Sequence, residues 1–173
     1  MRKPNKVGGG AKTNVNGLAF EGRTNLLDAF KADKNFEIVR SKVFYNNQLI
    51  GEYLEKHSFY KDFLEPNGIS YSNINSKKYL PDSVFYNHKN KTVYIIEKKF
   101  QEQPGSVDEK IQTCGFKKYI FSKLITPMGL KIEYYYLLND WFDQTQYNDV
   151  FDYIKEVGCK YFINFIPFDE LGL

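Results

Sequence analysis

Two carboxylates and an ammonium group are spaced along the middle of the chain so that they could act together. Asp82 follows Pro81, and 15 positions later the run Glu97-Lys98-Lys99 ends an apolar stretch. Two acidic side chains supply the hard oxygen ligands that Mg²⁺ prefers. A neighbouring lysine can orient water and contact a phosphate. These residue types indicate metal-dependent hydrolysis of a phosphodiester.

A β-hairpin is the element that would bring these groups together. Residues 79–86 and 92–96 are rich in β-branched and aromatic residues, and the turn-forming residues 87–90 separate them. Because successive side chains of a strand point to opposite faces, Glu97 and Lys99 should share a face while Lys98 points away. Strand pairing should then place Asp82 beside Glu97 and Lys99.

The remaining elements follow from hydrophobic periodicity and turn residues. We predict helices over 18–32, 107–124 and 145–157, a weakly helical segment over 49–64, and extended segments over 36–45, 132–138 and 161–166. This order favours an α/β fold with a mixed β-sheet flanked by helices. We expect one domain over residues 17–173, preceded by a flexible basic arm over residues 1–16.

Charge is unevenly distributed along the 173 residues. Residues 1–131 carry 22 Lys and Arg against 13 Asp and Glu, whereas residues 132–173 carry 2 against 8. This asymmetry suits a front that binds a polyanion and an acidic, aromatic-rich rear that serves as a dimer or scaffold surface. A merely solvated surface is the alternative.

Other sequence features narrow the setting of the protein. No apolar run approaches the roughly 20 residues of a membrane-spanning helix, and Met1-Arg2-Lys3 does not lead into the apolar run of a signal peptide. We therefore expect a cytoplasmic protein with no membrane contact. Cys114 and Cys159 lack metal-ligand spacing and should be reduced core residues. His57 and His88 have no partner histidine at ligand spacing, which argues against a histidine-metal nuclease.

The two motifs together resemble a known family. Leu80-Pro81-Asp82 followed by Ile95-Ile96-Glu97-Lys98-Lys99 resembles the PD-(D/E)XK nuclease superfamily, particularly its restriction-endonuclease-like members. The resemblance covers roughly residues 17–138 and implies an αβββαβ core. It also implies roles for individual residues: Asp82, Glu97 and the Lys98 backbone carbonyl as metal ligands, Lys99 as the catalytic lysine, Glu21 as a further catalytic acid, and Gln112 as a supporting residue. Phe116 departs from the pattern, because some relatives carry a tyrosine four residues after this glutamine.

DNA contacts are expected from basic and amide side chains, since lysine and arginine bind phosphates while arginine and glutamine read base edges. The candidates are Lys12, Arg23, Lys98, Gln101, Gln103 and Lys110. Gln101 and Gln103 are the best placed for base reading, because they follow the motif strand directly in a loop that Pro104-Gly105 should hold away from the next helix.

The resemblance implies a type II restriction-type enzyme that uses Mg²⁺, with Mn²⁺ as a substitute. It would cut double-stranded DNA at a specific sequence and leave 5′-phosphate and 3′-hydroxyl ends. A homodimer is expected, because one site per chain requires two chains for two strands. Two alternatives stay open. One is a structure-specific, phage-type or homing endonuclease with the same centre, such as a junction resolvase, and the other is a non-catalytic DNA-binding module of this fold.

Overall fold

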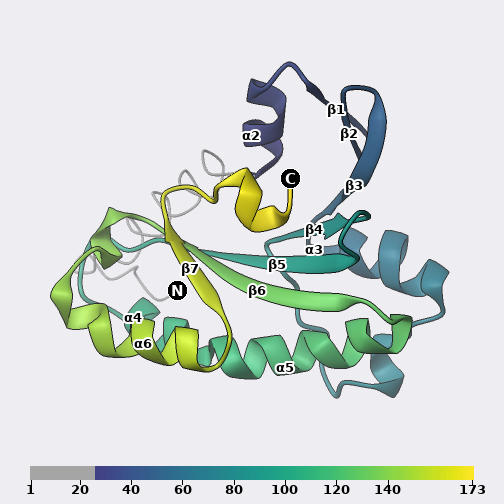
Figure 1. Cartoon of the computed structure of the whole chain (residues 1–173). Helices are drawn as coiled ribbons and strands as arrows, with labels where there is room; N and C mark the ends of the chain where they lie inside the picture. Colours follow the sequence, from purple (N-terminus) through teal and green to yellow (C-terminus); the bar gives the residue numbers. More distant parts are fainter. Residues whose placement is uncertain (1–25) are drawn as a thin grey trace, which may run out of the picture.

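Apolar strands separated by tight turns form one mixed β-sheet of seven strands in the computed structural model, which describes residues 26–173 (Figure 1). In chain order they are β1 (Phe36–Val39), β2 (Lys42–Tyr45), β3 (Gln48–Leu54), β4 (Ser83–Asn87), β5 (Thr92–Lys99), β6 (Lys131–Leu138) and β7 (Lys160–Ile163). The spatial order of the strands is the same as their order in the chain. Strands β1 to β5 pair antiparallel, whereas β5 with β6 and β6 with β7 pair parallel. The predicted α/β class and mixed sheet are confirmed.

Helices cover the sheet, and those that follow β5 connect its parallel strands. They are α2 (Leu26–Ala32), α3 (Lys56–Ser58), α4 (Val107–Lys110), α5 (Cys114–Ile125) and α6 (Asn148–Glu156). A helical turn over Phe59–Leu64 continues directly from α3. Helices α4, α5 and α6 lie along one face of the sheet, whereas α2 and the C-terminal segment lie toward the other (Figure 1). Among residues 26–173, none of the helices has the length and apolar character needed to cross a membrane.

The alternation of side chains along β5 and β6 divides the core between the two faces. Val93 and Ile95 of β5 pack in the larger core, together with Tyr134 of β6 and buried residues of α5 and α6. Tyr94 of β5 and Tyr135 of β6 point to the opposite face and pack in a second core with α2. An odd-numbered residue of β5 therefore faces α5, and an even-numbered one faces α2.

Two segments differ from their sequence-based predictions. The helical prediction for residues 49–64 is wrong over its first part, which forms β3, and right only from Lys56 onward. Residues 36–45, predicted as one extended segment, form the β1–β2 hairpin with Arg40 in the turn at φ 58°. The sheet consequently has more strands on the β3 side than the sequence indicated.

Strand β3 approaches β4 unusually closely at Gly51, which pairs with Asn87. A Cβ atom added at Gly51 would lie 2.8 and 2.9 Å from two ring carbons of Phe85, and closer still to the carbonyl oxygen of Tyr86. Phe85 is fully buried in the second core. Glycine is thus required here by space rather than by backbone conformation.

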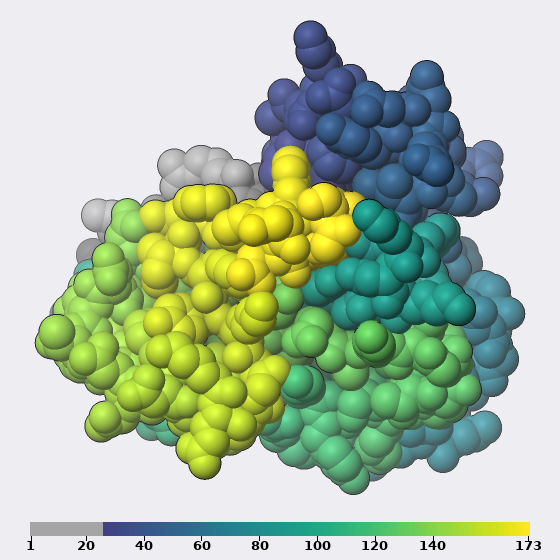
Figure 2. Space-filling view, in the orientation of Figure 1, coloured from purple at the N-terminus to yellow at the C-terminus, as the bar shows by residue number. Residues whose placement is uncertain are grey.

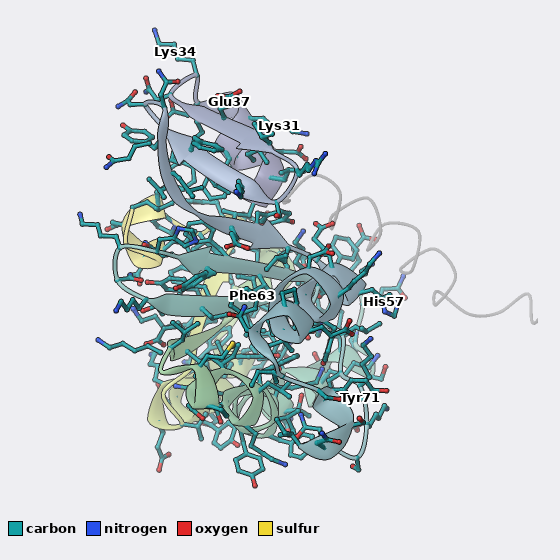
Figure 3. The ribbon with its side chains drawn as sticks, turned by 90° about the vertical axis from the view of Figure 1, so that its right-hand side faces the viewer. Lys31, Lys34, Glu37, His57, Phe63 and Tyr71 are labelled. Carbon is teal, nitrogen blue, oxygen red and sulfur yellow. The ribbon has the colours of Figure 1, made fainter. Side chains whose placement is uncertain are left out.

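The C-terminal segment returns to the β4–β5 hairpin. The side-chain amide of Asn87 donates hydrogen bonds to the carbonyl oxygens of Leu171, at 2.9 Å, and Gly172, at 3.1 Å. In the space-filling view this segment, coloured yellow, lies between the purple-blue part of the chain and the green helical layer (Figure 2). Seen from the side, Lys31, Lys34 and Glu37 lie at one end of the molecule and Tyr71 lies at the opposite end (Figure 3).

Candidate active site

The β4–β5 hairpin brings Asp82, Glu97 and Lys99 together, as the sequence predicted. Ser83 of β4 pairs with Ile96 of β5, so Asp82, which immediately precedes β4, lies across from the end of β5. One carboxylate oxygen of Asp82, Oδ2, accepts a hydrogen bond of 2.9 Å from the backbone N–H of Lys98. Asp82 therefore lies just outside the strand in which it was predicted, and the neighbouring strand holds its side chain in place.

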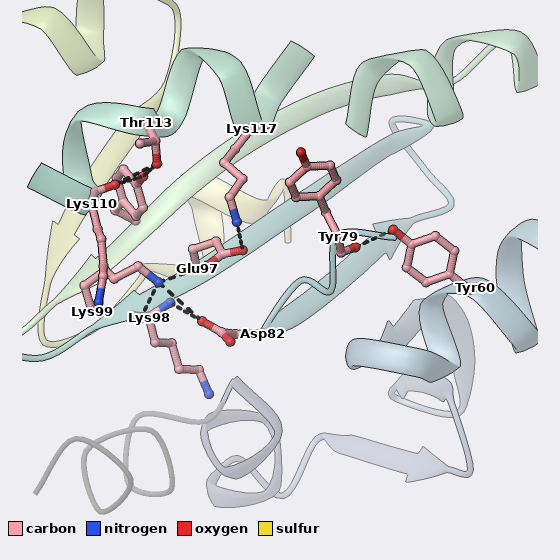
Figure 4. A network of polar contacts seen from close by, with 10 residues as sticks. Tyr60, Tyr79, Asp82, Glu97, Lys98, Lys99, Lys110, Thr113 and Lys117 are labelled. Carbon is pink, nitrogen blue, oxygen red and sulfur yellow. Dashed lines mark hydrogen bonds and ion pairs between the residues drawn. The ribbon is translucent and has the colours of Figure 1, made fainter. Parts of the chain in front are cut away.

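The ammonium of Lys99 lies among three oxygen atoms (Figure 4). Its Nζ is 2.9 Å from Oε2 of Glu97, 3.1 Å from the carbonyl oxygen of Lys98 and 3.9 Å from Oδ2 of Asp82. These oxygens belong to the three groups that the sequence proposed as metal ligands. The arrangement therefore already accommodates one positive charge.

Glu97 is buried although it lies near the end of β5, and only 4% of its surface is exposed. A buried charge is costly unless it is paired. Glu97 is paired twice, because Lys117 of α5 approaches its other oxygen, Oε1, at 3.4 Å. Burial, followed by the charge of Glu97, raises the pKa of Tyr134 well above its usual value, so this phenol stays neutral beside the site.

Lys117 is the site residue that the sequence reasoning missed. It comes from α5 because Glu97, an odd-numbered residue of β5, faces that helix. A signal was present in the sequence, since Lys117 lies three residues after Cys114 and four residues before Phe121, which are both fully buried. Positions three and four apart share one face of a helix. A lysine on the buried face of a helix indicates a buried acidic partner.

Several hydrogen bonds fix the segment that carries Asp82. The backbone N–H of Lys56 donates to the carbonyl oxygen of Pro81 at 3.0 Å, and the hydroxyl groups of Tyr53 and Ser83 lie 3.1 Å apart. The hydroxyl of Tyr60 donates to the carbonyl oxygen of Tyr79, and burial raises the pKa of Tyr60 to about 12. Residues from β3 and the following helical segment thus hold the chain on both sides of Asp82.

Gln101 is not placed as the sequence predicted. It is 1% exposed, and its side-chain amide donates to Oδ1 of Asp108 at 3.0 Å. Its backbone N–H and carbonyl both bond the side chain of Asn139, at 3.0 and 2.8 Å. In this arrangement Gln101 cannot reach a base edge. It ties the end of β5 to the end of β6, because a buried backbone needs hydrogen-bond partners.

The other residues predicted to support the site or contact DNA differ in their surroundings. Gln103 and Lys110 are exposed. Gln112 is exposed and donates to the carbonyl oxygen of Asp108 at 3.4 Å, within a surface pocket that also includes Tyr147 of the α6 side. The Lys98 side chain points away from Glu97, as expected, and lines a cavity of about 620 Å³ between α2 and the C-terminal segment. Glu21, Lys12 and Arg23 lie outside the described residues, as does the arm over residues 1–16.

The donor atoms fit a hard divalent cation. Over residues 26–173, no group of three or more His, Cys, Asp or Glu side chains is arranged to hold a metal ion. Two carboxylates and one carbonyl are nevertheless the oxygen donors that suit Mg²⁺, which keeps several waters and takes few protein ligands. Their gathering around the Lys99 ammonium indicates that a cation is favoured at this point.

Comparisons with known proteins leave the function to be argued from these residues. No protein-family model matches the chain, and neither a curated protein nor a solved structure matches it. An α/β fold by itself does not specify an activity, because one fold hosts many chemistries. The activity must therefore be inferred from the chemistry of Asp82, Glu97, Lys99 and Lys117.

Proposed function

We propose that this protein is a Mg²⁺-dependent DNA endonuclease whose centre is Asp82, Glu97 and Lys99. The observation that carries the proposal is the gathering of Asp82 Oδ2, Glu97 Oε2 and the Lys98 carbonyl around the Lys99 ammonium. A buried glutamate and a partly buried aspartate in contact with lysines add nothing to an apolar core. The free-energy cost of burying these charges is explained if the carboxylates hold a cation and the lysines contact a phosphate.

The roles of the residues follow from their chemistry. Asp82, Glu97 and the Lys98 carbonyl would hold Mg²⁺, which when bound lowers the pKa of a coordinated water and neutralises charge on a phosphate. Lys99 remains beside Glu97, where its ammonium can orient the attacking water and stabilise charge on the non-bridging oxygens. Lys117 would hold the Glu97 carboxylate in place through its other oxygen, Oε1. Hydrolysis would leave a 5′-phosphate and a 3′-hydroxyl.

The order of the elements supports a restriction-endonuclease-like fold as the finer assignment. With β1, β2 and the short helical elements left aside, α2, the antiparallel strands β3, β4 and β5, helix α5 and the parallel strand β6 occur in the order αβββαβ. The helical segment from α3 onward lies between β3 and β4. The resemblance of the two motifs to PD-(D/E)XK nucleases points in the same direction. Strands β1, β2 and β7 would then be additions at the two edges of that core.

Two kinds of DNA target are compatible with this centre. A restriction-type enzyme would cut duplex DNA at a specific sequence as a cytoplasmic homodimer. A structure-specific enzyme would instead cut where strands are unpaired, and a surface of lysines and exposed aromatic rings beside the site favours that second candidate. The restriction-type target and the dimer stay predictions.

Cleavage of plasmid DNA tests the centre itself. We expect the purified protein to nick or cut plasmid or flap DNA with Mg²⁺ and not with EDTA. Glu97→Gln and Lys99→Gln should each lower the rate by about 100-fold or more. The first removes an anionic ligand of the metal, and the second removes the ammonium that stabilises charge at the reacting phosphate. Lys155→Gln, which changes an exposed lysine of α6, is the matched control and should cut normally. Full activity in the Glu97→Gln protein, with folding verified by circular dichroism, would refute the assignment.

A further inference from the structure

Two segments beside the site are rich in lysine and contain no acidic residue. Residues 66–81 and 110–132 contain no Asp or Glu, and together they carry seven lysines. Helix α5 lies within the second of these ranges, and the first leads directly to Pro81 and Asp82. Lysines gathered in this way attract a polyanion.

The two segments are neighbours in space. Lys123 of α5 donates to the carbonyl oxygen of Ile74 at 2.7 Å, and the side-chain amide of Asn75 donates to the carbonyl oxygen of Ile120 at 3.2 Å. The lysines of residues 66–81 and of α5 therefore belong to one continuous surface, which we call the α5 surface.

Aromatic rings are exposed on the α5 surface. Phe116 is 51% exposed and Tyr119 is 59% exposed, and because they are three residues apart they lie on the same side of α5. Lysines lie over neighbouring rings, with the Lys123 ammonium 5.7 Å from the Tyr119 ring and the Lys77 ammonium 5.4 Å from the Tyr79 ring. Phe116 packs edge-on against Tyr79, with ring centroids 5.9 Å apart.

The α5 surface is continuous with the candidate active site. Lys117 reaches Glu97 with its ammonium, and the same ammonium lies 5.8 Å from the centre of the Tyr79 ring (Figure 4). Tyr79 is three residues before Asp82 in the chain. A strand bound along α5 would thus end at the two carboxylates.

We propose that the α5 surface binds an unpaired strand of DNA, so that the substrate class is DNA with a single-stranded region, such as a flap or a splayed end. This inference rests on the proposed nuclease function. Exposed aromatic rings stack on bases whose faces are free, whereas the bases of an intact duplex are already stacked on each other. Lysines contact the phosphates of either form, so the rings are what distinguish unpaired from paired DNA.

Binding measured in EDTA separates the substrates without cleavage. The probes are a labelled oligonucleotide of about 12 nucleotides, the blunt duplex of the same sequence, and that duplex carrying a single-stranded flap. We expect the flap to bind more tightly than the blunt duplex. The double variant Phe116→Ala with Tyr119→Ala should weaken binding of the oligonucleotide and the flap by about 10-fold to 100-fold, and of the blunt duplex by less than about 3-fold.

The matched control is Phe165→Ala. Phe165 is 69% exposed and lies beside the cavity that Lys98 lines, on the other side of the sheet from α5. It should leave all three affinities unchanged. Equal losses for duplex and oligonucleotide, or a change in oligomeric state by sedimentation in place of a change in binding, would overturn the proposal. If the wild-type protein prefers the flap yet never cleaves it with any divalent metal, the nuclease proposal fails and the α5 surface stands.

Discussion

Replacing Gly51 with alanine should destabilise the fold through a steric overlap between two paired strands. The added methyl group would meet the ring of Phe85 at 2.8 Å and the carbonyl oxygen of Tyr86 more closely still, whereas ordinary contacts to carbon begin near 3.4 Å. Neither neighbour can move easily, because Phe85 is fully buried and the Tyr86 carbonyl belongs to the backbone of β4. Strands β3 and β4 must therefore separate locally.

The magnitude follows from two contributions. Overpacking of a filled core costs about 1–3 kcal/mol. A hydrogen bond lost between β3 and β4 adds about 1 kcal/mol. We expect Gly51→Ala to lower the free energy of unfolding by about 3 kcal/mol and Tm by about 6–12 °C for a domain of this size.

Urea unfolding, followed by far-ultraviolet circular dichroism and by the fluorescence of Trp141, measures this effect. Gly105→Ala is the matched control, because the nearest atom to its added methyl group is the carbonyl oxygen of Gln103 at 3.8 Å. It should change the free energy of unfolding by less than about 0.5 kcal/mol, or stabilise slightly by restricting the unfolded chain. A Gly51→Ala protein as stable as wild type, with an unchanged urea dependence, would show that the overlap argument is wrong.

Two further predictions concern buried polar groups. Lys117→Met should lower the free energy of unfolding by about 1–2 kcal/mol in urea titrations, because Glu97 loses one of its two lysine partners. Lys117→Arg should keep most of the wild-type stability. A methionine variant as stable as wild type would refute the pairing. Burial raises the pKa of Tyr60 to about 12 from its ordinary 10, so the folded protein holds this proton more tightly and stability falls as pH rises from 10 toward 12. Tyr60→Phe should show a shallower fall than wild type in urea titrations over that range, and an identical pH dependence would contradict it.

The hairpin that carries the site could be predicted because its signals are local. Alternating β-branched and aromatic residues predict β4 and β5, and the turn residues between them set the pairing that places Asp82 near Glu97. Strand β3 was missed because its inward and outward residues do not alternate cleanly. Its conformation is set by pairing with β2 and β4 on both sides. The β1–β2 turn was missed because Arg40 adopts a positive φ, which sequence patterns assign to Gly or Asn.

The surroundings of the site depend on contacts between distant residues. Glu97 receives its second lysine from a position 20 residues later, and only the packing of α5 on the sheet determines that Lys117 meets it. Gln101 follows the motif strand directly and was expected to face DNA. The β5–β6 pairing instead brings it beside Asn139, whose side chain binds its backbone. The burial of Gln101 depends on which strand end is its neighbour in the sheet. A single segment of sequence does not contain that information.

The strands of the described sheet succeed one another in space as they do along the chain, with β1 and β7 at its two edges. Each strand therefore joins at an open edge, and a chain emerging from the ribosome never has to separate strands that have already paired in order to admit another. The hairpin that holds Asp82, Glu97 and Lys99 precedes α5 in the chain and therefore leaves the ribosome first. The two carboxylates can thus come together without α5, whereas Lys117 reaches Glu97 only once that helix packs on the sheet.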